Sequence, residues 1–120
     1  MRKFKLQNVD IEYHINKEKQ VVIAICKSRM LEYNAVCKSY VAISYFTTVG
    51  MASPKKEDKF NVETGKKVAR AIAEKRAYEV LRAKAKKYLK ELQQDAEQTL
   101  EVLNSTTALI QHQKEYISKF

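Results

Sequence analysis

The sequence predicts an α+β fold in which an antiparallel sheet of three or four strands packs on a long C-terminal helix that continues into a coiled coil. The first half of the chain carries alternating or β-branched apolar stretches, residues 66–120 contain no Gly or Pro, and apolar residues there recur at spacings of three and four. We therefore expect a β-sheet plus basic helix domain over residues 1–90 and a helical coiled-coil tail over residues 91–120.

Three strands are expected in the first half. Residues Val9 to Ile15 alternate between apolar and polar side chains, which is typical of a half-buried strand. A polar hairpin loop follows at 16–20, and a second strand runs from Val21 to Lys27 with apolar residues on both faces, as in a central strand. A third strand, dense in β-branched and aromatic residues, is expected from Val36 to about Thr48.

The distance between the two cysteines depends on how the second and third strands pair. A tight hairpin centred between Leu31 and Glu32 places Cys26 directly opposite Cys37. Two reduced, buried thiols are favoured over a disulfide, because the chain has no secretory signal and a cytosolic location is expected. Two cysteines alone supply neither a disulfide framework nor a four-cysteine zinc site.

The helix begins after a turn that starts at Gly50 and a loop over residues 54–59. Asn61 is the expected N-cap, since its side-chain oxygen can accept from the free amides of the first turn. Glu63 lies where the helix dipole favours a negative charge. Gly65 lowers helix propensity, so we expect the helix to approach another backbone closely there.

The apolar face of this helix changes direction along its length. At about 100° per residue, the face expected to lie on the sheet comprises Gly65, Val68, Ala69, Ile72, Ala73, Val80 and Ala83. A second face, spaced by threes and fours, predicts an oligomer interface, most simply in a homodimer, at Leu81, Tyr88, Leu92, Leu103, Ile110 and Ile117. A helical hairpin folded back at residues 104–107 is the alternative; we favour a continuous helix.

The net charge of +9 is unevenly distributed: +5 over residues 1–60, +7 over residues 61–90 and −3 over residues 91–120. Flexible cations along a helix can contact phosphates without reading bases, although a basic surface also serves solubility alone. The expected nucleic-acid-binding residues are Lys55, Lys56, Lys66, Lys67, Arg70, Lys75, Arg82, Lys86 and Lys87. Tyr40 and Tyr45 on a strand can stack bases, but packing within the sheet is the favoured role.

Catalytic chemistry has little support. Neither His14 nor His112 has a nucleophile or acidic partner at a recurring motif spacing, and no phosphate-binding or dinucleotide-binding loop is present. Asp10, Glu12 and His14 share a strand face, for which a solvated surface is favoured over a metal site. We expect no enzyme activity, no cofactor, and no membrane span because no apolar run is long enough.

Spaced residues around the helix start form a motif: Gly50, Ala52, Asp58, Phe60, Gly65 and Ala69. This 28-residue segment, 50–77, resembles small, mostly uncharacterised proteins encoded by bacteriophages and prophages of Gram-positive bacteria. It departs from their pattern at Ser53 and Pro54. The resemblance implies a phage origin, a bacterial host cell and a strand-turn-helix junction, but no substrate.

Two partner classes follow from charge and resemblance together. Sequence-tolerant binding of nucleic acid through the basic helix and its preceding loop is the favoured function. The alternative is a phage-encoded inhibitor that docks onto a host defence or replication protein, such as a CRISPR effector nuclease, through a sheet edge or the coiled coil. An assembly adaptor held together by the tail helix is a third class.

Overall fold

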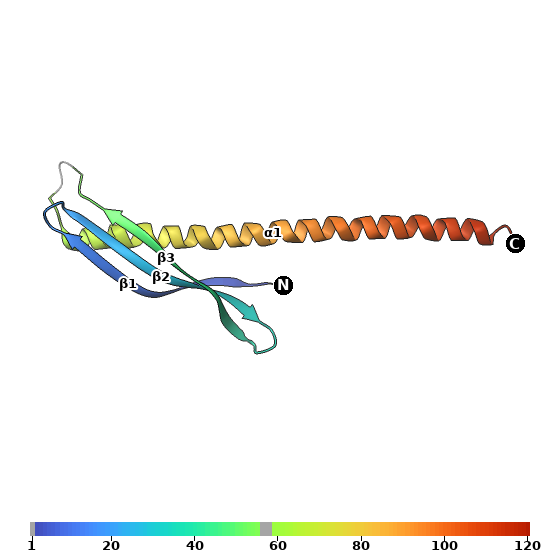
Figure 1. Cartoon of the computed structure of the whole chain (residues 1–120), viewed down its shortest axis with the longest axis horizontal. Helices are drawn as coiled ribbons and strands as arrows, with labels where there is room; N and C mark the ends of the chain where they lie inside the picture. Colours follow the sequence, from blue (N-terminus) through green and yellow to red (C-terminus); the bar gives the residue numbers. More distant parts are fainter. Residues whose placement is uncertain (1, 56–58) are drawn as a thin grey trace. The chain divides into compact units, whose positions relative to one another are not determined.

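The computed structural model describes residues 2–55 and 59–120. Its strands form one antiparallel sheet in the order β1-β2-β3, so each strand pairs with its neighbour in the sequence (Figure 1). The α+β class with a three-stranded sheet and one long C-terminal helix is confirmed. The elements are β1 (Phe4–Asn16), β2 (Val21–Asn34), β3 (Ser39–Ala52) and α1 (Val62–Ile117).

The chain divides into two compact units at Lys84 and Ala85, earlier than the boundary at residue 90 that the sequence predicted. The first unit contains the sheet and the beginning of α1. The second unit, Ala85–Phe120, is the remainder of α1 and a short terminus. In the described part of the chain, no helix has both the length and the apolar composition needed to cross a membrane.

A β-bulge in β1 explains why the sequence predicted only its second half. The pairing with β2 shifts between Asn8 and Asp10, which leaves Val9 without a partner and 58% exposed. An extra residue reverses the alternation of faces. Leu6 and Ile11 are therefore both half-buried although their numbers differ in parity, and the grouping of Val9 with Ile11 was wrong.

The β2–β3 hairpin turns later than predicted. Asn34 pairs with Ser39, and the Asn34 side-chain oxygen accepts the backbone amides of Val36 and Cys37 at 2.8 and 3.2 Å. This local bonding stabilises the turn. The predicted centre between Leu31 and Glu32 was wrong, because β2 continues through it.

The two cysteines consequently lie apart. Cys26 is buried and pairs across the strands with Thr48, whereas Cys37 lies in the turn and is exposed. Both are free thiols. The direct juxtaposition of Cys26 with Cys37, and the burial of both, were wrong.

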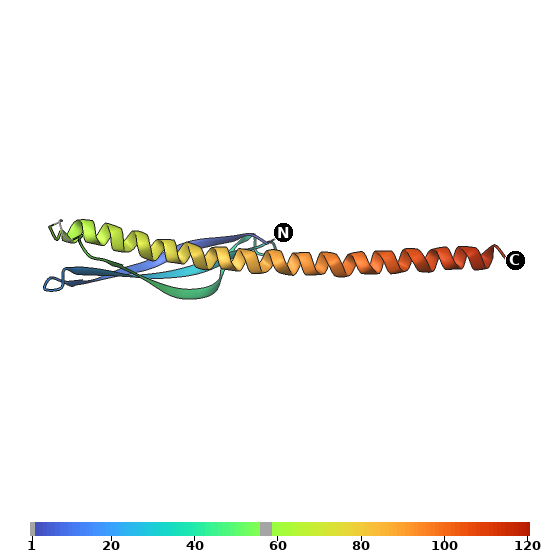
Figure 2. The same cartoon turned by 90° about the horizontal axis from the view of Figure 1, so that it is seen from above.

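In the first unit, α1 lies along one face of the sheet (Figure 2). The buried helix residues Ala69, Ala73 and Ala77 are spaced by four, and Ala69 and Ala73 belong to a core of small residues. Positions four residues apart advance by about 40° around the helix at each step. The row of buried helix residues therefore turns away from the single face that the sequence predicted. Val68, Val80 and Ala83, predicted to pack on the sheet, are exposed, and Ala77 was missed. The sheet residues of this core are Val22, Ala24, Cys26 and Ala52.

Glycines mark the closest approach between sheet and helix. Gly50 lies within β3 rather than in a turn, and a Cβ there would overlap the carbonyl oxygen of Ala69 and lie 2.6 Å from the amide nitrogen of Ala73. At Gly65 a Cβ would lie 2.7 Å from Cγ2 of Val22, so this helical glycine faces a side chain rather than the backbone that was expected.

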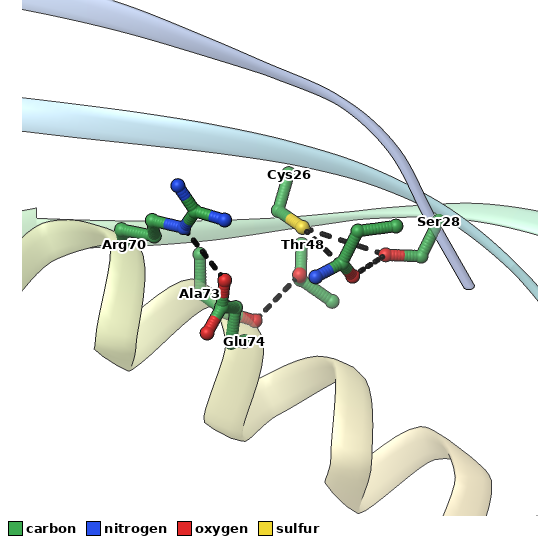
Figure 3. Close-up of polar contacts among 7 residues, drawn as sticks. Cys26, Ser28, Thr48, Arg70, Ala73 and Glu74 are labelled. Atoms are coloured by element: carbon green, nitrogen blue, oxygen red, sulfur yellow. Dashed lines mark hydrogen bonds and ion pairs between the residues drawn. The ribbon is translucent and has the colours of Figure 1, made fainter. Parts of the chain in front are cut away.

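Polar groups between sheet and helix are hydrogen-bonded (Figure 3). Thr48 Oγ1 donates to the carbonyl oxygen of Ala73 at 2.7 Å. The buried Ser28 hydroxyl donates to Asn8 Oδ1 at 3.1 Å, and the Cys26 thiol donates to the same oxygen at 3.6 Å. Each buried polar side chain thus keeps a partner, which avoids the desolvation penalty of an unpaired group.

The predicted helix start and continuity are confirmed. Asn61 Oδ1 accepts the backbone amide of Thr64 at 3.2 Å, as an N-cap does. Residues 104–107 are helical, and Thr106 and Thr107 donate their hydroxyls to carbonyl oxygens one turn earlier, at 2.7 and 2.8 Å. The predicted alternative of a hairpin at 104–107 is not adopted.

We expect Gly50→Ala to lower the free energy of unfolding by about 3 kcal/mol or more, because its methyl group meets helix backbone that cannot rotate away. Gly65→Ala is the matched control: the gain in helix propensity of about 1 kcal/mol offsets part of the clash with Val22. Urea unfolding at one fixed protein concentration measures both. Equal losses for the two variants would contradict this account.

Glu32 links the start of the chain to the sheet. Arg2 Nε lies 2.6 Å from Glu32 Oε1. The hydrogen bond from Arg2 is the main cause that lowers the pKa of Glu32; partial burial opposes it, and the charges of Arg2 and Lys84 add to the lowering. A lowered pKa in the folded state means that the charged carboxylate stabilises the fold.

We expect Glu32→Gln to lower the free energy of unfolding at pH 7 by at most about 1 kcal/mol. The difference from wild type persists above the unfolded pKa of about 4.3 and disappears as the pH falls through the lower folded pKa. Urea unfolding between pH 7 and pH 3 measures it. Glu18→Gln, in an exposed turn, is the control, and a difference at Glu32 that stays constant with pH would refute the linkage.

Candidate nucleic-acid interface

Two of the predicted cations flank the sheet beside β1. Lys66 Nζ lies 5.5 Å from the ring centroid of Tyr13 and 3.9 Å from Glu63 Oε1. Arg70 Nε donates to Glu74 Oε1 at 2.7 Å (Figure 3). The hydrogen bond that Arg70 donates to Glu74, followed by the negative charge of that carboxylate, raises the pKa of Arg70. The charge of Arg70 is therefore already balanced by Glu74, whereas Lys66 forms only a long ion pair with Glu63.

Three other predicted cations lie on the solvent side of α1 in the first unit. Lys67, Lys75 and Arg82 are exposed and follow one another at intervals of eight and seven residues, which is about two helical turns, or roughly 11 to 12 Å. Lys75 pairs with Glu79 at 3.8 Å, and within the described residues no ion pair forms at Lys67 or Arg82. We call these three residues the solvent stripe.

The remaining predicted cations do not join the solvent stripe. Lys55 is exposed and lines a hollow of about 500 Å³ at the start of α1, together with Lys59, Phe60 and Asn61. Lys56 lies outside the described residues, as does Asp58 of the phage-like motif. Lys86 and Lys87 are exposed but belong to the second unit.

The sheet face opposite α1 gathers aromatic and basic side chains, of which the sequence analysis named Tyr40 and Tyr45 as able to stack bases. Cross-strand pairing places Lys5 beside Leu31, Arg29 beside Tyr45, and Tyr33 beside Tyr40. Arg29, Leu31 and Tyr33 alternate along β2, and paired residues share a face, so these side chains and their partners lie on the face opposite α1. A register shift between Met30 and Leu31 puts Tyr45 and Tyr40 on the same face although their numbers differ in parity. Leu31 itself is buried. Because the sequence analysis placed the centre of the β2–β3 hairpin wrongly, it could not predict which tyrosines and cations are paired across the strands.

Aromatic and cationic groups contact one another on this face. The Tyr33 and Tyr40 rings meet edge to face with centroids 5.5 Å apart. Lys5 Nζ lies 4.2 Å from the Tyr40 centroid, and Lys3 Nζ lies 5.8 Å from that of Tyr33. Tyr45 is 71% exposed, so the packing role that the sequence favoured for it does not apply.

The acidic end of the same face holds Asp10, Glu12 and His14. Lys27 Nζ contacts Glu12 Oε1 at 3.4 Å, an exposed ion pair. Within residues 2–55 and 59–120, no three His, Cys, Asp or Glu side chains lie close enough together to hold a metal ion.

The predicted oligomer interface divides between the units. Leu81 is half-buried in the first unit and continues the four-residue spacing of Ala69, Ala73 and Ala77. Tyr88 is half-buried in the second unit. The other four predicted interface residues are exposed there: Leu92, Leu103, Ile110 and Ile117.

Comparison with protein-family models, with curated proteins and with solved structures finds no match to this chain. The likeness of residues 50–77 to phage-encoded proteins stays a prediction, and function is argued from the chain's own side chains.

Proposed function

We propose that this chain is a non-enzymatic protein that binds nucleic acid with little regard to sequence and associates with other copies through its second unit. The observation that carries the proposal is the solvent stripe, in which Lys67 and Arg82 are exposed cations with no ion pair in the described residues. Cations at such intervals can each contact a phosphate, and none of them reads a base.

The ion pairs near the solvent stripe leave most of the predicted cations available. The Lys66–Glu63 and Lys75–Glu79 distances are 3.9 and 3.8 Å, and both pairs are open to solvent. Such pairs contribute little and exchange readily for a phosphate. Arg70, bonded to Glu74 at 2.7 Å, is the weakest candidate of the predicted set. The proposed site of action is the cytoplasm of a bacterial host, as the phage resemblance implies.

A second candidate function is the inhibition of a host defence or replication protein, such as a CRISPR effector nuclease. An apolar patch at one end of the uncovered sheet face favours it: Ile23 and Ile25 are half-buried, and Val49 and Met51 are exposed. Exposed apolar side chains that adjoin one another often mark a protein interface.

We expect the affinity for a DNA duplex to fall steeply as salt rises, because bound phosphates release their counterions. Replacing both Lys67 and Arg82 with Gln removes two phosphate contacts and should lower the slope of log K against log salt by about 2. Fluorescence anisotropy over a salt series measures this slope for a labelled duplex.

The matched control replaces Lys17 and Lys19 with Gln. Both are exposed in the β1–β2 turn and change the net charge by the same amount. Equal effects from the two pairs of substitutions would show that net charge, and not the position of the solvent stripe, determines the affinity. Salt-independent or undetectable binding, with stoichiometric capture of a host protein, would favour the inhibitor function instead.

Association is expected to depend on the seam of the second unit. Replacing Leu103 and Ile110 with Asp places two charges in the predicted contact and should convert the oligomer to a monomer. Gln94→Asp with Ala108→Asp, on the opposite side of the helix by its period, should leave the oligomer intact. Light scattering after size exclusion gives the molar mass. A wild-type monomer would refute self-association.

A further inference from the structure

We propose that the uncovered face of the sheet binds single-stranded nucleic acid by stacking bases on tyrosines. This inference rests on the proposed function and names its ligand more closely. The surface, here called the aromatic face, lies toward the β2–β3 turn and consists of Lys3, Lys5, Arg29, Tyr33, Tyr40 and Tyr45.

The register alone brings these residues together. Gln7, Arg29 and Tyr45 are neighbours across the three strands, as are Lys5, Leu31 and Ala42. The backbone amide of Tyr33 donates to the carbonyl oxygen of Lys3 at 2.9 Å, which extends the same arrangement beyond the start of β1. Rows on one face of a strand are about 7 Å apart. Each of the three rows thus holds one cation, namely Lys3, Lys5 or Arg29, and the first and third rows hold tyrosines.

Charge favours an anionic ligand on the aromatic face. Lys3, Lys5 and Arg29 contribute three positive charges there. Glu32 projects to the opposite face of the sheet, toward α1, where it pairs with Arg2. Among the described residues, the carboxylates of the uncovered face are Asp10 and Glu12, which lie past the bulge toward the other end of β1.

Ring exposure favours a single strand over a duplex. Bases of a duplex are stacked inside it and reach no side-chain ring, whereas bases of a single strand can stack on exposed aromatics. Tyr45 is 71% exposed and makes no ring contact that would cover it in the described structure. The ring of Tyr40 is covered by Lys5 Nζ, but an exposed cation–π contact is worth only about 0.5–1 kcal/mol, and a phosphate can draw that ammonium away.

A protein partner fits this surface less well than the apolar patch of the same sheet. Ile23, Ile25, Val49 and Met51 carry no charge and lie at the other end of β2 and β3. The aromatic face instead alternates cations with rings. This combination is the one that sequence-tolerant single-strand binding uses.

The test measures binding of the full chain to labelled oligothymidylate and to a duplex of equal length. Tyr45→Ala should weaken single-strand binding about five-fold or more, as expected for one lost stacking contact. Tyr45→Phe keeps the ring and should bind like wild type. Duplex affinity should be unchanged in both variants, because duplex contacts use phosphates alone.

Met51→Ala is the matched control, since this side chain is 59% exposed on the same strand and face but is not aromatic. It should bind both probes like wild type. Lys5→Gln gives a second readout and should lower the salt slope for the single strand by about 0.7. Urea unfolding of each variant verifies that the fold is retained.

The outcomes separate the two proposals. Wild-type single-strand affinity in Tyr45→Ala, or an equal loss for single strand and duplex, would overturn stacking on the aromatic face while the duplex-binding solvent stripe stands. An unchanged salt slope in Lys5→Gln would also count against this face. Failure of the wild-type chain to bind either probe would overturn both proposals.

Discussion

The contact on which the first unit depends is the backbone approach of β3 to α1 at Gly50. At Gly50 no side chain separates the strand from Ala69 and Ala73. Two residues earlier in β3, the Thr48 hydroxyl donates a hydrogen bond to the Ala73 carbonyl oxygen. Close approach lets small residues exclude water without large side chains. The buried core between sheet and helix therefore consists of small residues, and the larger Ile11, Tyr13 and Phe60 pack partly buried against it.

That shallow core also determines which surfaces are available. One helix covers one face of the three-stranded sheet, and the side chains of β2 on the other face are exposed or half-buried except Leu31, which is buried. β2 is apolar on both faces, and it is the central strand that this pattern predicted, although not one whose apolar residues are all buried. Ile23 and Ile25 are instead only half-buried, by neighbours within the sheet and not by a second layer. The open face therefore combines an apolar end with a cationic, aromatic end.

Features set by local chemistry were predictable from the sequence. The fold class, the Asn61 cap and the continuous helix follow from periodicity, capping residues and the absence of Gly and Pro, and all three are confirmed. Features that depend on how the strands are paired could not be predicted from the sequence. One extra residue at Val9 and a turn displaced from Leu31 to residues 35–38 moved whole strands relative to their partners.

The same distinction between local sequence and strand register applies to the candidate sites. The cations of the solvent stripe were predictable, because helical period alone places Lys67, Lys75 and Arg82 on one side. Their pairing state was not, since Glu63 and Glu79 lie at spacings that permit ion pairs without requiring them. The aromatic face was anticipated only in part: Tyr40 and Tyr45 were named as able to stack bases, but Tyr33 meets Tyr40 only in the displaced register.

If the chain binds nucleic acid as proposed, its second unit gives a physical reason why weak phosphate contacts can suffice. Apart from Tyr88, its side chains are exposed along a helix with apolar residues at heptad spacing, and an isolated helix gains little stability without packing. Association between copies would supply that packing. Linking copies also converts later binding events into intramolecular ones, which raises avidity without any new contact. A few loosely paired lysines in each copy, too weak to hold nucleic acid individually, would then act together on one strand.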